Sequence, residues 1–153
     1  MLAGHDKVYL NLSVKQKEKK TDWHSEAQGV KTLLPIANEV GIKRIFYLSS
    51  LIRRYQGMNG FDWWVLKLKN EAVSMIRASG IPSTIFYPST FMEAIPTQYM
   101  QGRRLMIAGL SKHKQHFIAS ADYAQQVLNA IETNTGTDNK DYVIQGPEAL
   151  PDR

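Results

Sequence analysis

Apolar positions along the chain form two kinds of pattern that follow one another in a regular order. Residues 7–14, 43–50 and 83–87 carry compact runs of apolar, aromatic and β-branched side chains, which are typical of strands. Between them, residues of about 25–40 and 62–79 carry apolar side chains at the spacing of one helix face. The order strand, helix, strand, helix, strand predicts an α/β fold with a parallel sheet, right-handed crossovers and flanking helices.

The middle run, residues 45–50, is the organising element of this pattern. Four apolar or aromatic residues precede Ser49 and Ser50, as expected of a strand that is covered on both faces. Ligands of open α/β sheets bind at the carboxyl ends of strands, so the two serines are candidate ligand contacts. Serines also open turns, and the sequence leaves both interpretations open.

Polar residues and breakers predict where the helices begin and end. Asp22 and Asp62 are candidate N-caps, and Gly41 ends the first helix. Pro35 is expected to kink that helix or to leave a carbonyl unpaired. The apolar stripe predicted for the second helix consists of Val65, Leu68, Ala72, Met75 and Ile76.

The remainder of the chain has a less regular pattern. Residues 92–117 are irregular, with a short helix expected near 95–102 and a short strand near 105–107. A helix capped by Ser120 or Asp122 and a strand at 141–145 follow.

Length and composition fit one ordinary globular domain. The 153 residues carry a net charge of +5, and the densest basic run, residues 15–20, is interrupted by Glu18, so a nucleic-acid partner is not expected. The sequence holds no cysteine, and His113 and His116 have no carboxylate beside them, so no metal site is predicted. No membrane-spanning run or signal peptide is present in these residues, and a cytoplasmic protein without a membrane partner is expected.

Four segments in this order resemble one protein family. They are residues 29–50, Lys67 with Glu71, residues 79–91 and residues 117–124. Together they resemble the atypical short-chain dehydrogenase/reductases, and among these the NmrA-like NAD(P)H-binding branch. The resemblance implies a Rossmann-like sheet with NAD or NADP lying across the strand ends, and it does not choose between the two cofactors.

Carried over by position, the resemblance implies a set of cofactor-binding residues. Lys67 would bond the nicotinamide ribose, a role that suits an ammonium group with three donors. The alternative for Lys67 is a solvated pair with Glu71 at i+4. The other residues implied at the cofactor are Asn11, Leu12, Ser13, Leu48, Ser49, Ser50, Tyr87, Pro88, Ser89, Thr90 and Phe91.

The acid–base chemistry of the family is only partly matched. The relay tyrosine of the family stands four residues before the lysine, where this chain has Trp63. An indole cannot become an oxyanion and return a proton at useful pH. Lys67, Ser50 and Tyr55 are therefore the catalytic candidates, with Tyr55 or Tyr87 as substitutes for the missing phenol.

The glycine-rich loop of the family is the other departure. No GxGxxG occurs in these residues, and the strand at residue 7 corresponds to the fourth strand of the family fold. We therefore expect residues 1–153 to form a single partial NAD(P)-binding domain that lacks the first three strands, with 92–117 as a substrate-side insertion. The exposed edge of strand 7–14 suggests a homodimer in which a second chain covers it.

Three functions remain open. The first is an oxidoreductase that acts on a small carbonyl or activated double bond of a small-molecule substrate. The second is a non-catalytic NmrA-like NAD(P)H-sensing regulator, which Trp63 favours. The third is a truncated fragment without cofactor binding, which the missing phosphate loop favours.

Overall fold

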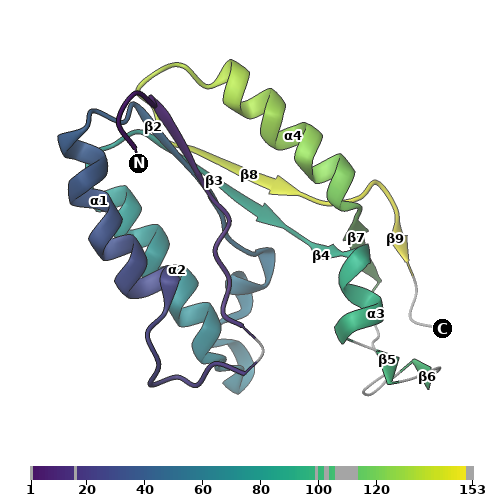
Figure 1. The fold of residues 1–153 in the computed structure, drawn as a ribbon. Coiled ribbons are helices and arrows are strands. Elements are labelled where there is room, and N and C mark those ends of the chain that lie inside the picture. Colours follow the sequence, from purple (N-terminus) through teal and green to yellow (C-terminus); the bar gives the residue numbers. More distant parts are fainter. Residues whose placement is uncertain (1, 16, 99, 102–103, 106–113, 151–153) are drawn as a thin grey trace. The chain divides into compact units, whose positions relative to one another are not determined.

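The computed structural model describes residues 2–15, 17–98, 100–101, 104–105 and 114–150 (Figure 1). The chain divides into two compact units, residues 1–87 with 135–142 and residues 88–134 with 143–153. Each unit is described by itself. No helix in the described ranges is long and apolar enough to cross a membrane.

Parallel strands form the sheet of the first unit. β1 (Lys7–Leu10) pairs with β2 (Arg44–Leu48), and β2 pairs with β3 (Ser83–Pro88), both in parallel. β8 (Lys140–Ile144) is the fourth strand, in the order β1-β2-β3-β8. The predicted parallel sheet is confirmed, although β1 ends at Leu10 and residues 11–13 follow the strand instead of completing it.

Two helices cover one face of this sheet and lie side by side (Figure 1). They are α1 (Val30–Glu39) and α2 (Trp64–Ala78). The core between helices and strands is formed by buried apolar side chains, including Val30, Leu34, Ile45, Tyr47, Ala72, Ile76 and Ile85. Because side chains alternate along a strand, the Phe46 and Phe86 rings point to the opposite face, where they stack with centroids 6.3 Å apart.

The helix starts differ from the predicted caps. A π-helical turn, η1 (Ser25–Gly29), precedes α1, and Asp22 instead accepts a hydrogen bond from the Lys19 backbone N–H at 2.8 Å. Asp62 does not cap α2 because its carboxylate binds the Lys67 ammonium and the Gln56 amide. α1 runs continuously through Pro35, so the proline does not end it.

The buried stripe of α2 also differs from the predicted one. The buried residues are Leu66, Lys69, Ala72, Val73 and Ile76, whereas Val65, Leu68 and Met75 are only half-buried. Only Ala72 and Ile76 belong to both sets. The prediction was wrong because a charged residue, Lys69, occupies the centre of the buried face.

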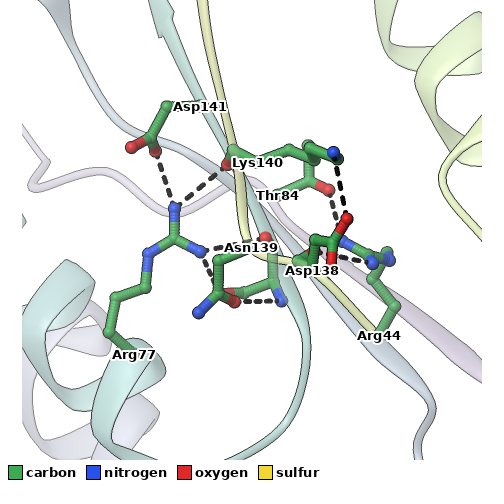
Figure 2. A network of polar contacts seen from close by, with 8 residues as sticks. Arg44, Arg77, Thr84, Asp138, Asn139, Lys140 and Asp141 are labelled. Atoms are coloured by element: carbon green, nitrogen blue, oxygen red, sulfur yellow. Dashed lines mark hydrogen bonds and ion pairs between the residues drawn. The ribbon is translucent and has the colours of Figure 1, made fainter. Parts of the chain in front are cut away.

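Hydrogen bonds from Arg44 of β2 and Arg77 of α2 hold β8 and the chain before it in the first unit (Figure 2). Buried Arg44 donates to Thr84 Oγ1 at 2.9 Å, to the Asp138 carbonyl at 2.9 Å and to the Gly136 carbonyl. Arg77 donates to Asp141 Oδ1 at 2.7 Å and to the carbonyl oxygens of residues 83 and 140, each at 3.0 Å. These contacts give hydrogen-bond donors to four backbone carbonyls of the first unit.

The second unit is a smaller arrangement of short strands and helices. β4 (Thr90–Phe91) pairs in parallel with β7 (Gln115–Ile118), which pairs antiparallel with β9 (Ala149–Leu150). β5 (Met100–Gln101) and β6 (Arg104–Leu105) form an antiparallel pair. The predicted helix near 95–102 is the single turn α3 (Ile95–Gln98), and residues 106–107 of the predicted strand lie outside the described residues.

Its long helix, α4 (Ser120–Thr133), begins with a cap from elsewhere in the chain. Neither Ser120 nor Asp122 is the N-cap residue, which is Ala119. Glu93, in the turn η4 (Met92–Ala94), accepts from the Ser120 backbone N–H and from its hydroxyl, both at 2.9 Å. These hydrogen bonds lower the pKa of Glu93, because they favour its ionised form.

Candidate functional site

The carboxyl ends of β1, β2 and β3 lie at one edge of the sheet. Leu10 is opposite Tyr47, and Leu48 is opposite Phe86, with the Ser49 backbone N–H donating to the Phe86 carbonyl at 2.8 Å. The segments that follow, 11–13 and 49–50, therefore emerge at the same edge. This edge is where ligands of parallel sheets bind, and it is the candidate site.

The two serines at the end of β2 have different environments. Ser50 Oγ accepts from the Ile52 backbone N–H at 3.4 Å and caps the turn η2 (Leu51–Tyr55), as a turn-forming serine does. Ser49 is 3% exposed, and its Oγ has no hydrogen-bond partner in the described part of the chain. Buried hydroxyls are almost always satisfied, so the lack of a partner makes the Ser49 hydroxyl a candidate functional group.

Arg53 joins η2 to the neighbouring elements, a role that no pattern in the sequence indicates. Its guanidinium lies over the Tyr87 ring at 4.7 Å and donates to Asn70 Oδ1 on α2 at 2.8 Å. Burial raises the pKa of Tyr87, and the Arg53 charge acts in the opposite direction. A buried phenol with a raised pKa is a poor substitute for the relay tyrosine.

Lys67 is exposed on the first turns of α2. Its Nζ donates to Asp62 Oδ2 at 2.8 Å, and both side chains are at least half exposed. The alternative for Lys67, a solvated ion pair, is thus observed, but with Asp62 as the partner instead of Glu71. The hydrogen bond from Lys67 lowers the pKa of Asp62. Lys67 shares a helix face with Asn70, three residues on, which contacts Arg53.

Trp63 and Tyr55 are both accessible. Trp63 is 46% exposed and stands at the N-cap of α2, with its backbone N–H donating to Gln56 Oε1 at 3.1 Å. Tyr55 ends η2 and is 57% exposed. The position of the relay tyrosine is thus occupied by a surface indole.

A buried charged cluster beneath β1 and β2 is the feature that the sequence interpretation missed. Lys69 Nζ donates to Glu26 Oε1 at 2.5 Å and to the Leu12 carbonyl at 3.4 Å. The Tyr47 hydroxyl donates to the same Glu26 oxygen at 3.2 Å. Burial raises the pKa of Tyr47 most, and the Glu26 carboxylate raises it further, so the phenol stays protonated. One pattern in the sequence could have indicated the cluster, because each buried helical stripe contains a single charged residue. The first stripe consists of Glu26, Val30, Leu34 and Ala37, and the second consists of Leu66, Lys69, Val73 and Ile76.

The other predicted cofactor contacts are distributed over both units. Asn11 and Ser13 are exposed after β1, with the Ser13 hydroxyl donating to the Val14 carbonyl at 3.4 Å. Residues 88–91 belong to the second unit. There, the Ser89 backbone N–H donates to the Ile144 carbonyl at 2.9 Å, its Oγ has no partner among the described residues, and Phe91 meets Tyr123 edge-on at 5.2 Å.

Metal ligation finds no support in the described residues. Among them, no group of three or more His, Asp or Glu side chains is placed to hold a metal ion. His116 Nδ1 lies 2.9 Å from the Gly146 carbonyl, and His113 lies outside the described residues.

Two side chains of the first unit carry groups of the kind that bind a nicotinamide cofactor. The Ser49 hydroxyl and the Lys67 ammonium are groups that can bind ribose hydroxyls, and Asn11 and Ser13 are exposed. The sequence contains no glycine-rich loop to hold the pyrophosphate.

Comparison with protein families gives one match. A family profile described as NAD(P)H-binding matches residues 1–134. No curated protein matches the sequence.

Solved structures share the fold. A nucleoside-diphosphate-sugar epimerase from Staphylococcus aureus superposes with a TM-score of 0.69 at 22% identity, over 95% of this chain and 49% of its own. An NADPH-dependent quinone oxidoreductase from Escherichia coli, in complex with NADPH, superposes with a TM-score of 0.70 at 21% identity. The match covers 98% of this chain and 49% of the oxidoreductase. A UDP-glucuronic acid 4-epimerase from Bacillus cereus, in complex with NAD, superposes with a TM-score of 0.74 at 14% identity. The match covers 94% of this chain and 55% of the epimerase. The chain thus has a Rossmann-like α/β fold and spans about half the length of these proteins.

Proposed function

The chain belongs to the NAD(P)H-binding family, and we propose that it contributes the nicotinamide-side part of the site of an NAD(P)-dependent oxidoreductase. The observation that carries the proposal is the buried, unpartnered hydroxyl of Ser49 at the carboxyl edge of a parallel sheet.

In this proposal the residues at the strand edge bind and orient the cofactor. Lys67 exchanges its exposed partner Asp62 for the nicotinamide ribose, and Ser49 donates to the same part of the cofactor. The backbone of Asn11–Ser13 and Leu48–Ser50 lines the cofactor, and Tyr87–Phe91 border the nicotinamide ring. When bound, the cofactor supplies the hydride, and the protein supplies orientation and exclusion of water.

The substrate that we propose is a small carbonyl or activated double bond. The E. coli protein of the same fold is a quinone oxidoreductase, and quinones combine both features. Reduction also needs a proton. Ser50 and Tyr55 are the candidate donors, because Trp63 cannot supply one.

We further propose the context of this site. Residues 1–153 form part of one NAD(P)-binding domain, with 92–117 on the substrate side. A second copy of the chain covers the β1 edge, and the protein acts in the cytoplasm. Light scattering that finds only monomers at high concentration would contradict the dimer.

Cofactor titration tests the proposal. NADH and NADPH are added up to the millimolar range while amide shifts are followed by NMR. We expect saturable shifts at residues 11–13 and 48–50, and a dissociation constant raised about fivefold by Ser49→Ala, because a hydroxyl donor to the cofactor is lost. Ser74→Ala, on the exposed face of α2, is the control. Absence of saturable binding, or unchanged affinity in Ser49→Ala, would contradict the proposal.

A non-catalytic NAD(P)H-sensing regulator is the second candidate, favoured by the exposed indole at the relay position. Turnover with a panel of quinones, aldehydes and enones separates the two. We expect Trp63→Tyr to leave cofactor affinity nearly unchanged, because the side chain is on the surface. A gain of turnover in this variant favours the oxidoreductase, as does parent turnover that Tyr55→Phe abolishes. Cofactor binding without turnover in any variant favours the regulator.

A further inference from the structure

We infer that Lys69, Glu26 and Tyr47 form a buried positioning cluster that sets the conformation of the cofactor-binding segment Asn11–Ser13 through the Leu12 carbonyl. The inference rests on the proposed function, since it assigns to this cluster the placement of one wall of the cofactor site.

The cluster joins four parts of the first unit. Glu26 lies on the π-helical turn η1, Lys69 on α2, Tyr47 on β2, and Leu12 in the segment that follows β1. Lys69 Nζ contacts both Glu26 Oε1, at 2.5 Å, and the Leu12 carbonyl, at 3.4 Å. One ammonium therefore connects the helix layer to the segment beyond the strand end.

Stability alone does not account for charges at these positions. Glu26, on the turn η1, is 0% exposed, and Lys69, on the buried face of α2, is 9% exposed. A buried ion pair is commonly no more stabilising than apolar residues of the same volume, because desolvation offsets the attraction. Every other buried position of α2 is apolar, so Lys69 stands where a leucine would suffice for packing.

The hydrogen bonds are directional and end at the segment after β1. Glu26 Oε1 accepts from Lys69 and from the Tyr47 hydroxyl, whereas Glu26 Oε2 has no partner among the described residues. These two donors fix the carboxylate, and the carboxylate holds the ammonium beneath the Leu12 carbonyl. Residues 11–13 lie beyond the last β1–β2 pair, Leu10 with Tyr47, so the strand ladder does not hold them.

The π-helical turn brings Glu26 into the cluster. The Gly29 backbone N–H donates to the His24 carbonyl at 3.3 Å, a bond five residues apart that widens the turn. Such turns are rare, and proteins use them often at functional sites. In η1, Glu26 is the one residue that is buried, so the turn directs this side chain toward the core.

The test compares variants that separate positioning from folding. Lys69→Met alone leaves Glu26 buried and uncompensated, so that variant can fail to fold. The informative variant is Lys69→Met combined with Glu26→Gln, which removes both charges at nearly constant volume. Lys69→Arg is the conservative variant, because it keeps the cation and its donors. Lys31→Met, an exposed lysine of α1, is the matched control.

Hydrogen exchange gives a readout that does not need a cofactor. We expect the double variant to fold cooperatively and to exchange the amides of residues 11–14 about tenfold faster than the parent, with β2 and β3 unchanged, because a local anchor is lost. NADPH affinity, followed by NMR shifts, is expected to fall about fivefold or more. Lys69→Arg is expected to restore part of both, and Lys31→Met to leave both unchanged.

Three results would overturn the inference. Unchanged exchange at residues 11–14 in the folded double variant would show that the cluster does not hold them. Unchanged NADPH affinity would show that the segment does not depend on the cluster for binding. Loss of folding in the double variant would assign the cluster to stability instead. If the parent itself binds no NADPH, the proposed function fails, and the exchange result still decides whether the cluster holds this segment.

Discussion

Lys67 is held at the surface by a weak partner. Its ion pair with Asp62 has both side chains at least half exposed, and such pairs contribute little to stability. A ligand with oxygen acceptors can therefore take the ammonium at small cost. The function proposed above requires this exchange, in which Lys67 leaves Asp62 for the ribose of the cofactor.

The pKa of Asp62 reports which partner Lys67 has. The hydrogen bond from Lys67 lowers this pKa, so any group that removes the ammonium should raise it toward its ordinary value. We expect Lys67→Ala to raise the pKa of Asp62 in an NMR titration, and saturating NADPH to raise it in the parent. With a lowered folded-state pKa, this pair stabilises the protein above the ordinary carboxyl pKa, and the contribution is lost as pH falls through the folded value.

An unchanged pKa of Asp62 with NADPH bound would show that Lys67 does not move to the cofactor. Lys31→Ala, on α1, is the matched control and should leave the pKa of Asp62 as it is.

The chain before β8 depends on a buried arginine of β2. Arg44 donates to Thr84 Oγ1 and to two backbone carbonyls, and burial lowers its pKa (Figure 2). We expect Arg44→Met to lower the free energy of unfolding by about 2–4 kcal/mol, because buried acceptors lose their donors. Urea denaturation measures this change. Arg54→Met, at an exposed position of η2, should change it by less than about 0.5 kcal/mol, and equal effects in the two variants would contradict this role.

Close backbone approach next to β7 requires a glycine. The Gly146 backbone N–H donates to the Phe117 carbonyl at 2.9 Å, and a Cβ at Gly146 would collide with that oxygen. We expect Gly146→Ala to destabilise the protein by about 1–3 kcal/mol in urea denaturation, because backbone must move to make room. Gly136→Ala is the control, since a Cβ there meets nothing within 4 Å. A neutral Gly146→Ala would show that this strand edge yields readily.

Cofactor affinity of the 153-residue chain should be limited by what its sequence lacks. It contains no GxGxxG, so it offers no glycine-rich loop for the pyrophosphate, whose backbone donors carry much of the binding in such folds. We expect these residues alone to bind NADH or NADPH much more weakly than the E. coli quinone oxidoreductase of the same fold. Fluorescence and NMR titrations measure both proteins, and micromolar binding by this chain would contradict the expectation.

The sequence by itself determined the order of strands and helices and the edge at which the candidate site lies. Local periodicity predicts the apolar strands at 45–48 and 83–87 and the helical stripe between them. This periodicity is a property of neighbouring residues and does not depend on distant parts of the chain. Parallel pairing followed from that order, because crossover helices between strands permit little else.

Only the tertiary structure decided which polar groups are buried, paired or left free. Glu26 and Lys69 are 43 residues apart in the chain, so neither residue by itself indicates an ion pair. The pair forms only when the fold brings η1 and α2 together. Glu93 caps α4 from 27 residues away, so the local cap candidates were wrong. Ser49 and Ser50 look equivalent in the sequence, yet Ser50 caps a turn, whereas the buried hydroxyl of Ser49 has no partner among the residues that the structure describes. The physical reason is the same in each case: desolvation and long-range hydrogen bonds depend on neighbours that local sequence does not specify.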